Sequence, residues 1–562
     1  MVKLLFCSCF FLAMALAADR PAGRLGAGRS VVWARNGMVA TSQPLAVQAG
    51  LQILRQGGNA VDAAVATAAV LAVVEPMSTG LGGDMFAMVY SARTGELHGL
   101  NGSGFSPRAV TRDFFVQKNL SEIPMYGPFS VTVPGTVDGW ATLLDKYGTM
   151  KLAQVLAPAI EYAENGFPVS EVIAWEWQKD GPAAAGRDPE FARAYFVPDS
   201  HGGHPPAEGE VFVNKPLAAT LRRIAAGGRD AFYKGEIARK IVERLNQLGW
   251  PMSLEDLAEQ HSDWVEPIST TYKGYRVFEL PPNGQGMAAL EMLNILEGYD
   301  LKSLGFNSAP YLHLLVDAKR LAFADLDAWL ADPAKARLPV EQIISKDYAR
   351  KQRARIDPNH AMPEPSTGIP LSSFDWRKSH SDTVYLTVVD KDRNAVSFIN
   401  SIFQNFGSSI VVPGAGIILQ DRGALFTLDP GYPNCIAPHK RPFHTIIPAM
   451  VFRDNKPWLS FGVMGGDMQP QGHVQVLLNM LEFGMNVQDA GEAPRFRHSP
   501  ATGLTLESGV DPQVVRDLDE MGHHITYDLY KFGGYQAIQI DWKNGTLAAG
   551  TDPRKDGCAA GW

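Results

Sequence analysis

The chain has 562 residues, of which 46% are hydrophobic and 20% are charged, with a formal net charge of −8 at pH 7. Such a chain can bury a large core and by length alone suggests roughly two to four domains. The acidic balance and the lack of a long basic run exclude a nucleic-acid-binding protein, because phosphate binding depends on clustered Lys and Arg.

The N-terminus has the pattern of a secretory signal peptide. Lys3 precedes an apolar stretch at 4–16, and Ala-Leu-Ala at 15–17 fits the small-x-small cleavage pattern. We therefore expect residues 1–17 to be removed and the protein to be exported, to a periplasm or outside the cell. The stretch is shorter than the roughly 20 apolar residues of a membrane span, so no stable span is expected, with an uncleaved anchor as the alternative.

Cysteines and histidines show no spacing typical of a metal site. Only Cys435 and Cys558 remain after this processing, and two cysteines cannot form a disulfide framework. The sequence leaves open whether they pair. His523 and His524 are adjacent rather than one helical turn apart, so we predict surface positions for both. Neither a metal nor a cofactor is expected.

The first part of the chain predicts a short strand followed by two helices. Residues 45–55 have helical periodicity between Pro44 and a Gly-Gly stop, and residues 59–74 form an Ala/Val-rich segment. The run Gly-Leu-Gly-Gly-Asp at 80–84 then precedes a strand at 85–90. Its glycines allow close approach of two backbones, and no Lys-Ser/Thr follows to make it a phosphate loop.

Residues 150–350 read as mainly helical, and residues 356–381 are rich in proline and turn formers, which predicts an exposed, mobile linker. After it, β-branched alternation at 383–389 and 395–402 predicts a hairpin. Further strands are expected at 410–412, 417–419, 449–453, 458–463 and 537–542, with a helix at 472–483. Helices thus dominate the first two thirds and strands the last third, as in an α+β protein with helix-covered sheets.

Thr383 is a candidate nucleophile because it follows the flexible polar segment 378–382 and begins a strand. A cut between Asp382 and Thr383 would give one residue both a hydroxyl and a free α-amine, the threonine variant of nucleophilic catalysis. The α-amine pKa is near 8 in peptides, so the amine can act as general base. Locally, however, a threonine at a strand start is most often only a β-former.

A glycine turn after the strand at 458–461 is a second candidate. Paired backbone N–H groups at Gly465 and Gly466, in the run Gly-Val-Met-Gly-Gly-Asp at 462–467, can hold an oxyanion. A simple turn is the alternative on local grounds.

Taken together, these segments resemble the γ-glutamyltransferase (glutathione hydrolase) family of N-terminal-nucleophile hydrolases. Matching stretches occur in the same order across nearly the whole mature chain. They are Gly-Gly-Asn-Ala-Val-Asp-Ala-Ala at 57–64, Glu-Pro at 75–76, Gly-Leu-Gly-Gly-Asp at 80–84, Val-Pro-Gly-Thr-Val-Asp-Gly at 133–139, Thr383 with Val-Val-Asp-Lys-Asp at 388–392, Lys-Arg-Pro at 440–442, Gly465-Gly466, Ala-Pro-Arg-Phe at 493–496 and Asp-Pro-Arg-Lys-Asp-Gly at 552–557.

The resemblance implies a four-layer αββα sandwich made as one proenzyme that cleaves itself between Asp382 and Thr383. The large subunit would be residues 18–382 and the small subunit residues 383–562, a heterodimer in one composite fold. Ser401 lies where the family has a threonine that hydrogen-bonds the nucleophile, and Gly465 and Gly466 lie at its oxyanion hole. The substrate would be a γ-glutamyl or related acyl amide such as glutathione, with water or an amine as acceptor.

Several pocket positions depart from the family. Ser103 stands where the family has the arginine that binds the glutamyl α-carboxylate, and a serine cannot supply that bidentate charged contact. The other replacements are Leu425 for the aspartate that holds the α-amine, His444-Thr445 for a Ser-Ser pair, Phe403 for an asparagine and Val384 for a second threonine. Arg422 and His444 are candidates for binding an acidic substrate, with a structural role as the alternative for each. Ser103 and Thr445 are candidates for lining the substrate pocket.

Three hypotheses follow. The first is a γ-glutamyl hydrolase or transferase. The second keeps the mechanism with another acyl amide, as in the divergent branch with glutaryl/cephalosporin acylase-like and oxamate amidohydrolase-like members, and Ser103 and Leu425 favour it. The third is an uncleaved, exported binding protein without catalysis.

Overall fold

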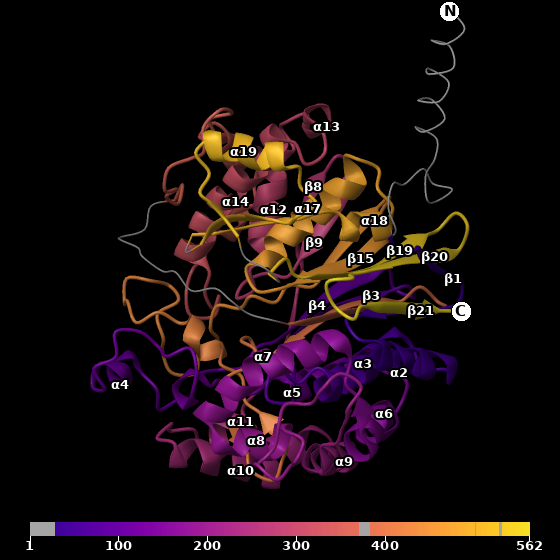
Figure 1. Ribbon diagram of the computed structural model, residues 1–562, viewed down its shortest axis with the longest axis vertical. Helices are drawn as coiled ribbons and strands as arrows, with labels where there is room; N and C mark the ends of the chain where they lie inside the picture. Colours follow the sequence, from indigo (N-terminus) through magenta and orange to yellow (C-terminus); the bar gives the residue numbers. More distant parts are fainter. Residues whose placement is uncertain (1–27, 370–382, 501, 528–530) are drawn as a thin grey trace, which may run out of the picture.

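Two seven-stranded antiparallel sheets lie face to face in the middle of the protein, with helices over both outer faces (Figure 1). The structure is a computed structural model, and it describes residues 28–369, 383–500, 502–527 and 531–562. The predicted α+β class and αββα layering are confirmed. Among the described helices, none is long and apolar enough to cross a membrane.

The two sheets, named here sheet A and sheet B, are built from strands that are far apart in sequence. In order across the sheet, sheet A consists of β1 (Val32–Ala34), β20 (Thr546–Thr551), β19 (Gly534–Asp541), β15 (Lys456–Met464), β14 (Ala449–Arg453), β9 (Tyr275–Glu279) and β8 (Ile268–Tyr272). Sheet B consists of β21 (Cys558–Gly561), β2 (Met38–Thr41), β10 (Val384–Val389), β11 (Ala395–Ser401), β3 (Asp84–Ser91), β4 (Glu96–Gly102) and β7 (Asp263–Val265). Strands from before and after Thr383 therefore interleave in both sheets.

Two helical layers cover these sheets. The layer on sheet B contains α2 (Pro44–Arg55), α3 (Ala60–Val74), α4 (Arg112–Val116), α5 (Thr136–Tyr147), α6 (Leu152–Asn165), α7 (Glu171–Arg187), α8 (Pro189–Tyr195), α9 (Lys215–Tyr233), α10 (Glu236–Gln247) and α11 (Leu254–Ala258). The layer on sheet A contains α12 (Gly286–Leu296), α13 (Leu301–Leu304), α14 (Ala309–Trp329), α15 (Val340–Ile343), α16 (Lys346–Arg353), α17 (Met468–Leu481), α18 (Val487–Glu492) and α19 (Pro512–Glu520).

Short elements complete the described chain. They are β5 (Phe167–Pro168) with β6 (Val211–Phe212), β12 (Val411–Val412) with β13 (Ile417–Ile418), the sheet of β16 (Phe496–Ser499), β17 (Gly503–Leu506) and β18 (Ile525–Thr526), and the 3₁₀ turns η1 (Pro128–Ser130) and η2 (Arg422–Leu425).

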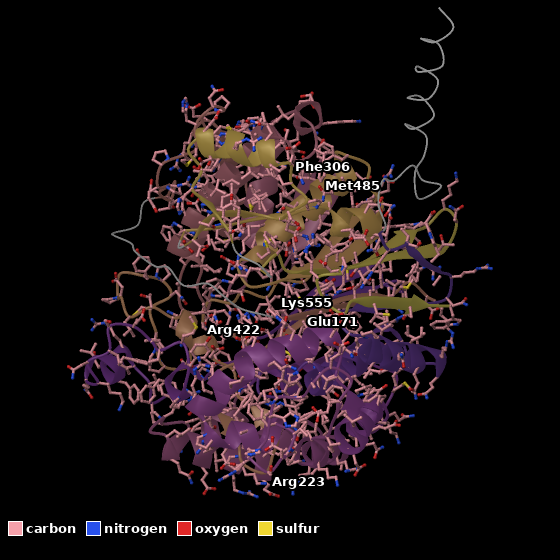
Figure 2. All side chains as sticks on the ribbon, in the orientation of Figure 1. Glu171, Arg223, Phe306, Arg422, Met485 and Lys555 are labelled. Carbon is pink, nitrogen blue, oxygen red and sulfur yellow. The ribbon has the colours of Figure 1, made fainter. Side chains whose placement is uncertain are left out.

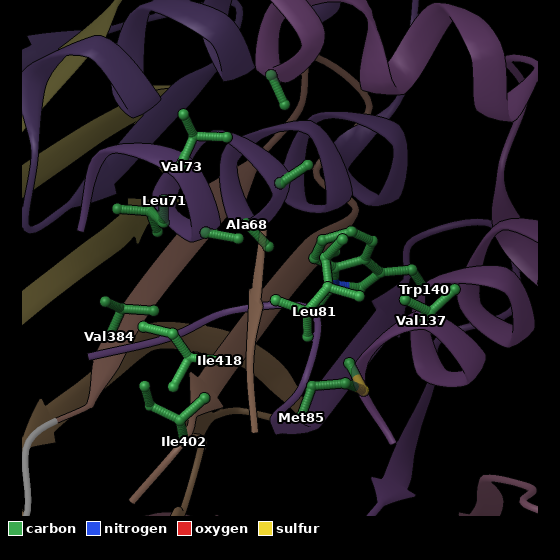
Figure 3. Close-up of a cluster of buried hydrophobic side chains, with 14 of the residues drawn as sticks. Ala68, Leu71, Val73, Leu81, Met85, Val137, Trp140, Val384, Ile402 and Ile418 are labelled. Carbon is green, nitrogen blue, oxygen red and sulfur yellow. The ribbon is translucent and has the colours of Figure 1, made fainter. Parts of the chain in front are cut away.

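Three apolar clusters separate the four layers. One lies between sheet B and its helices, one between sheet A and its helices, and a smaller one between the two sheets. Helix α3 shows why the first cluster is well packed. Its Ala/Val-rich sequence is buried on every side because the helix lies between the sheet and the outer helices. In Figure 3 the α3 side chains Ala68 and Leu71 lie on the side of the helix toward Val384, at the start of β10, and Val73 lies on the opposite side.

The start of α3 is fixed by polar contacts. Asn59 caps the helix, and the Asp62 side chain accepts the backbone N–H of Asn59 in return, which forms a capping box. The strand and helices predicted over residues 38–74 are thus confirmed, as is the hairpin of β10 and β11.

Some predictions from the sequence were wrong. The region 150–350 is mainly helical, as predicted, but the short strands β5 to β9 within it were not expected. Strands β7, β8 and β9 are only partly buried, so their apolar pattern is weak. Helix α17 begins at Met468, four residues earlier than predicted. Residues 357–369 of the predicted linker are irregular but attached to α14, where Met362 N–H donates to Asp317 at 3.0 Å and Gly368 N–H donates to Asp325 at 3.0 Å. The remainder of the predicted linker lies outside the described residues.

Candidate active site

Thr383 directly precedes the first rung of the β10–β11 ladder. Val384 pairs with Asn400, so Thr383 faces Ser401 on the neighbouring strand. The two hydroxyl oxygens are 3.2 Å apart, and both residues are fully buried. The structure therefore brings together the predicted nucleophile and the residue predicted to hydrogen-bond it. Asp382, on the other side of the predicted cleavage site, lies outside the described residues.

Ser401 is the centre of a small hydrogen-bond network. Its Oγ accepts the backbone N–H of Phe403 at 2.9 Å and Arg422 Nη2 at 2.9 Å. Thr383 Oγ1 donates to the same oxygen at 3.2 Å, so Ser401 Oγ accepts from three donors. When Thr383 Oγ1 loses its proton, the Ser401 hydroxyl hydrogen can be donated to it instead. A donor in that position stabilises negative charge that develops on the nucleophile.

Arg422 is a fully buried cation next to this pair. It begins η2, and its guanidinium donates to Thr445 Oγ1 at 2.7 Å as well as to Ser401, while stacking 4.5 Å from the Phe403 ring centroid. Figure 2 places it at the level of the two sheets. Within the part of the chain that the structure describes, Arg422 forms no ion pair, and its Nε has no hydrogen-bond partner.

Arg422 is nevertheless charged at neutral pH. Burial lowers its pKa to about 10, against the opposing effects of the Asp84 and Asp421 carboxyls. Buried charges are normally paired with an opposite charge. A guanidinium whose direct partners are hydroxyls is therefore suited to receive an anion from a substrate.

Asp84, which sequence analysis did not name as a site residue, organises the loops around the site. One carboxylate oxygen accepts the backbone N–H groups of Gly104 and Gly135 and the Gln420 amide, at 3.1, 3.1 and 3.0 Å. The other lies 3.0 Å from His444 Nε2. Burial raises the Asp84 pKa to about 7. The available signal was its place in the Gly-rich run at 80–84.

His444 is a neutral partner of Asp84. Burial, with the positive charges of Arg422 and Arg441, holds its pKa well below the usual range. Its Nδ1 faces the backbone N–H of Ile446 at 3.5 Å, so the proton is assigned to Nε2, which donates to Asp84. The imidazole thus contributes no positive charge for an acidic substrate. Direct contact of His444 with a substrate stays a prediction.

The glycine turn lies across the sandwich from Thr383. Side chains on one face of β10 meet β15, since Thr387 Oγ1 is 2.7 Å from Ser460 Oγ and the Tyr385 ring packs on Gly462. Continuing this register by two residues sets Thr383 opposite Met464, directly before Gly465 and Gly466. Both glycines have positive φ, 115° and 61°. Among hydrogen bonds between described residues, none is donated by either N–H group, as an oxyanion hole requires.

Ser103 and Thr445 are also near this network. Ser103 is buried, and its Oγ accepts the Asn283 amide at 3.0 Å. Thr445 joins two parts of the site, because its hydroxyl accepts from Arg422 while its carbonyl and that of Gly466 both accept the Gln285 amide. Contact of Ser103, Arg422 or Thr445 with a substrate stays a prediction.

No group of three potential metal ligands surrounds Thr383 among the described residues. The arrangement brings together a candidate hydroxyl nucleophile, a neighbouring hydroxyl, a cation and paired backbone N–H groups. These are the parts needed for acyl transfer.

The sequence profile of a known family, described as Gamma-glutamyltranspeptidase, matches residues 46–562. The chain belongs to the γ-glutamyltranspeptidase family. A glutathione hydrolase-like YwrD proenzyme of Bacillus subtilis (strain 168) is 41% identical, over 93% of this chain and 98% of its own length. An oxamate amidohydrolase proenzyme of Klebsiella pneumoniae is 34% identical, over 94% of this chain and 98% of its own length.

A solved structure supports the same placement. The cephalosporin acylase from Bacillus halodurans superimposes with a TM-score of 0.89 at 42% identity, over 97% of this chain and 99% of its own. This γ-glutamyltranspeptidase family member is therefore an enzyme of the N-terminal-nucleophile hydrolase type, and the hypothesis of a non-catalytic binding protein is wrong.

Proposed function

We propose that this family member cleaves itself before Thr383 and then hydrolyses amides of short acyl groups that carry a carboxylate. The observation that carries the proposal is Arg422, a buried cation one hydroxyl away from the nucleophile. Relatives named cephalosporin acylase and oxamate amidohydrolase support this choice.

The catalytic steps use groups already described. The free α-amine of Thr383 takes the proton from Oγ1, which attacks the acyl carbonyl. Gly465 and Gly466 N–H groups donate to the resulting oxyanion, and Ser401 donates to the attacking oxygen. The α-ammonium then gives its proton to the departing amine, which leaves an acyl ester on Thr383. Water repeats the sequence and releases the acid.

The distance between Arg422 and Thr383 limits the length of the acyl group. Two successive hydrogen bonds of 3.2 and 2.9 Å link Thr383 Oγ1 to Arg422 Nη2, so these atoms are at most about 6 Å apart. A carboxylate bound to Arg422 is then within a few bonds of the scissile carbonyl. Monoamides of dicarboxylic acids with about two to five carbons fit this span.

A γ-glutamyl hydrolase is the second candidate, because relatives of the chain are named glutathione hydrolases. Two positions weaken it. Leu425, where the resemblance places an aspartate, is a buried apolar side chain and cannot pair with the substrate ammonium. Ser103 carries no charge, and its hydroxyl is already bonded to Asn283.

A substrate series tests the proposal. The purified enzyme is assayed with the p-nitroanilides of glutaric, γ-glutamic and valeric acid, and with oxamate by ammonia release. We expect glutaryl to exceed valeryl, which lacks the carboxylate, by about tenfold or more in kcat/KM. We also expect no preference for γ-glutamyl over glutaryl. Strong γ-glutamyl preference would establish the second candidate, and equal glutaryl and valeryl rates would remove Arg422 as the carboxylate receptor.

The pH dependence should separate binding from catalysis. Burial raises the pKa of Asp84 to about 7 and that of Asp421 to about 8, so both carboxyls become neutral as pH falls from 9 to 6. Once Asp84 and Asp421 are neutral, their negative charges no longer weaken the attraction between Arg422 and the carboxylate of the acyl group. KM for glutaryl anilide should therefore fall by up to about tenfold. KM for valeryl anilide should stay flat. In contrast, kcat should fall for both substrates, since the α-amine base is protonated below about pH 8.

Export and subunit composition also belong to the proposal. Residues 1–17 have the pattern of a signal peptide, and relatives are named proenzymes. We therefore propose an exported heterodimer of residues 18–382 and 383–562. Cys435 and Cys558 are free thiols, and both lie in the proposed small subunit, so neither is placed to bridge the two subunits of one heterodimer.

A further inference from the structure

A buried cluster of two histidines and an aspartate lies between α14 and α19, in the helical layer over sheet A (Figure 1). His313 and Asp317 are one turn apart on α14, and His523 follows α19. One potential ligand atom of each residue lies within 4.8 Å of the others. Their exposed fractions are 0%, 0% and 4%. The predicted surface position of His523 is therefore wrong: after Gly522, at φ 94°, it turns inward while His524 stays exposed.

His313 is held in the form that a metal ligand needs. Its Nε2 is 2.7 Å from the backbone carbonyl of Asp357, and a carbonyl only accepts, so Nε2 carries the proton. The other ring nitrogen, Nδ1, therefore presents a lone pair to the cluster, where His523 Nε2 lies 2.9 Å away. A ring N–H fixed on a backbone carbonyl is the usual support of a metal-bound histidine.

Asp317 provides an independent observation. Its Oδ2 accepts the backbone N–H of Met362 at 3.0 Å, but its buried Oδ1 has no hydrogen-bond partner among the described residues. Arg320, one turn further along α14, forms no ion pair with it within the described chain. An unpartnered buried carboxylate oxygen beside two imidazoles is costly unless a cation compensates it.

We propose that His313 Nδ1, His523 Nε2 and Asp317 Oδ1 bind a divalent transition metal such as Zn²⁺. Two imidazoles and one carboxylate suit zinc or cobalt rather than Ca²⁺ or Mg²⁺, which prefer oxygen ligands. Tetrahedral ligands at about 2.1 Å from zinc are about 3.4 Å apart. The two imidazoles need to separate by a few tenths of an ångström, and the His523 proton moves to its Nδ1.

The metal would join two parts of the proposed mature enzyme. His313 and Asp317 precede Thr383 in the chain, and His523 follows it. The site would thus connect the two subunits that cleavage produces. Metal binding itself does not depend on that cleavage.

Cobalt titration of the full-length enzyme tests the site. After removal of bound metal with a chelator, Co²⁺ should bind with one-to-one stoichiometry and give the visible absorption of tetrahedral Co²⁺, which Zn²⁺ then abolishes. His523→Gln should weaken Co²⁺ binding at least about tenfold. His524→Gln, which changes the neighbouring exposed histidine, should leave it unchanged.

Asp317→Asn provides a second test with the same side-chain shape. It should also weaken Co²⁺ binding at least about tenfold and should remove the Zn²⁺-dependent rise in melting temperature. Thermal unfolding without metal shows that each variant is folded. Absence of stoichiometric binding by the wild type, or wild-type affinity in both His523→Gln and Asp317→Asn, would overturn the proposal.

Discussion

Thr383→Ala is expected to leave the protein as one uncleaved chain with no measurable amidase activity. The wild type should separate on a denaturing gel into bands for residues 18–382 and 383–562. In the proposed mechanism, the substitution removes the hydroxyl that attacks both its own peptide bond and the substrate. Loss of a catalytic nucleophile typically lowers kcat by about 10⁴-fold or more. Densitometry after long incubation, together with an anilide assay, measures both effects.

Two further variants make this result specific. Thr387→Ala removes the same atoms from the same face of β10, where the hydroxyl contacts Ser460 at 2.7 Å. It should cleave and retain activity, with a lower melting temperature. Thr383→Ser keeps a hydroxyl and should cleave, though more slowly. A Thr383→Ala chain that still separates into two bands would show that another residue, or a contaminating protease, makes the cut.

Arg422→Met should remove the preference for a carboxylate on the acyl group. Methionine keeps an unbranched side chain over the Phe403 ring but loses the charge. Loss of a charged hydrogen bond costs about 1.5–3 kcal/mol, so kcat/KM for glutaryl anilide should fall by roughly 10- to 100-fold or more. The value for valeryl anilide should fall much less. The ratio of the two values is the measurement.

The ratio of kcat/KM for glutaryl anilide to that for valeryl anilide separates loss of carboxylate binding from general damage to the active site. Arg422 also contacts Ser401 and Thr445, so its loss can slow both substrates equally, and only fully cleaved enzyme should be compared. Arg422→Lys retains a positive charge and should recover part of the glutaryl preference. An unchanged ratio in Arg422→Met would mean that the acyl carboxylate is bound elsewhere.

The sequence could predict those parts of the site that follow from local pattern. The β-branched alternation after Thr383, the return strand ending near Ser401 and the Gly-Gly turn are all readable over a few residues. The resemblance to a known family, which rests on the order of these segments along the chain, then assigned a role to each of them. The short strands β7 to β9 were missed because they have little apolar periodicity. Strands β8 and β9 form a hairpin with each other, but β7 and β9 find their other partners, β4 and β14, far away in the sequence.

Other features depend on contacts that no local pattern records. Asp84 and His444 are 360 residues apart in sequence, yet they share a hydrogen bond at the centre of the site. The pKa of Arg422 and its lack of a direct ion pair depend on which hydroxyls and carboxyls surround it after folding. Similarly, the burial of His523 follows from the packing of α14 against the chain after α19. Such features require the three-dimensional structure.

The interleaving of strands in both sheets has a consequence for refolding. Sheet B alternates β2 and β3, from before Thr383, with β21, β10 and β11, from after it. As a single chain the protein closes these sheets in a unimolecular reaction. Once cut, the same pairing requires two separate polypeptides to meet, so recovery from denaturant should become concentration-dependent. The uncleaved Thr383→Ala chain should refold at a rate independent of concentration. In dilute solution the mature enzyme should therefore persist through slow unfolding rather than through rapid refolding.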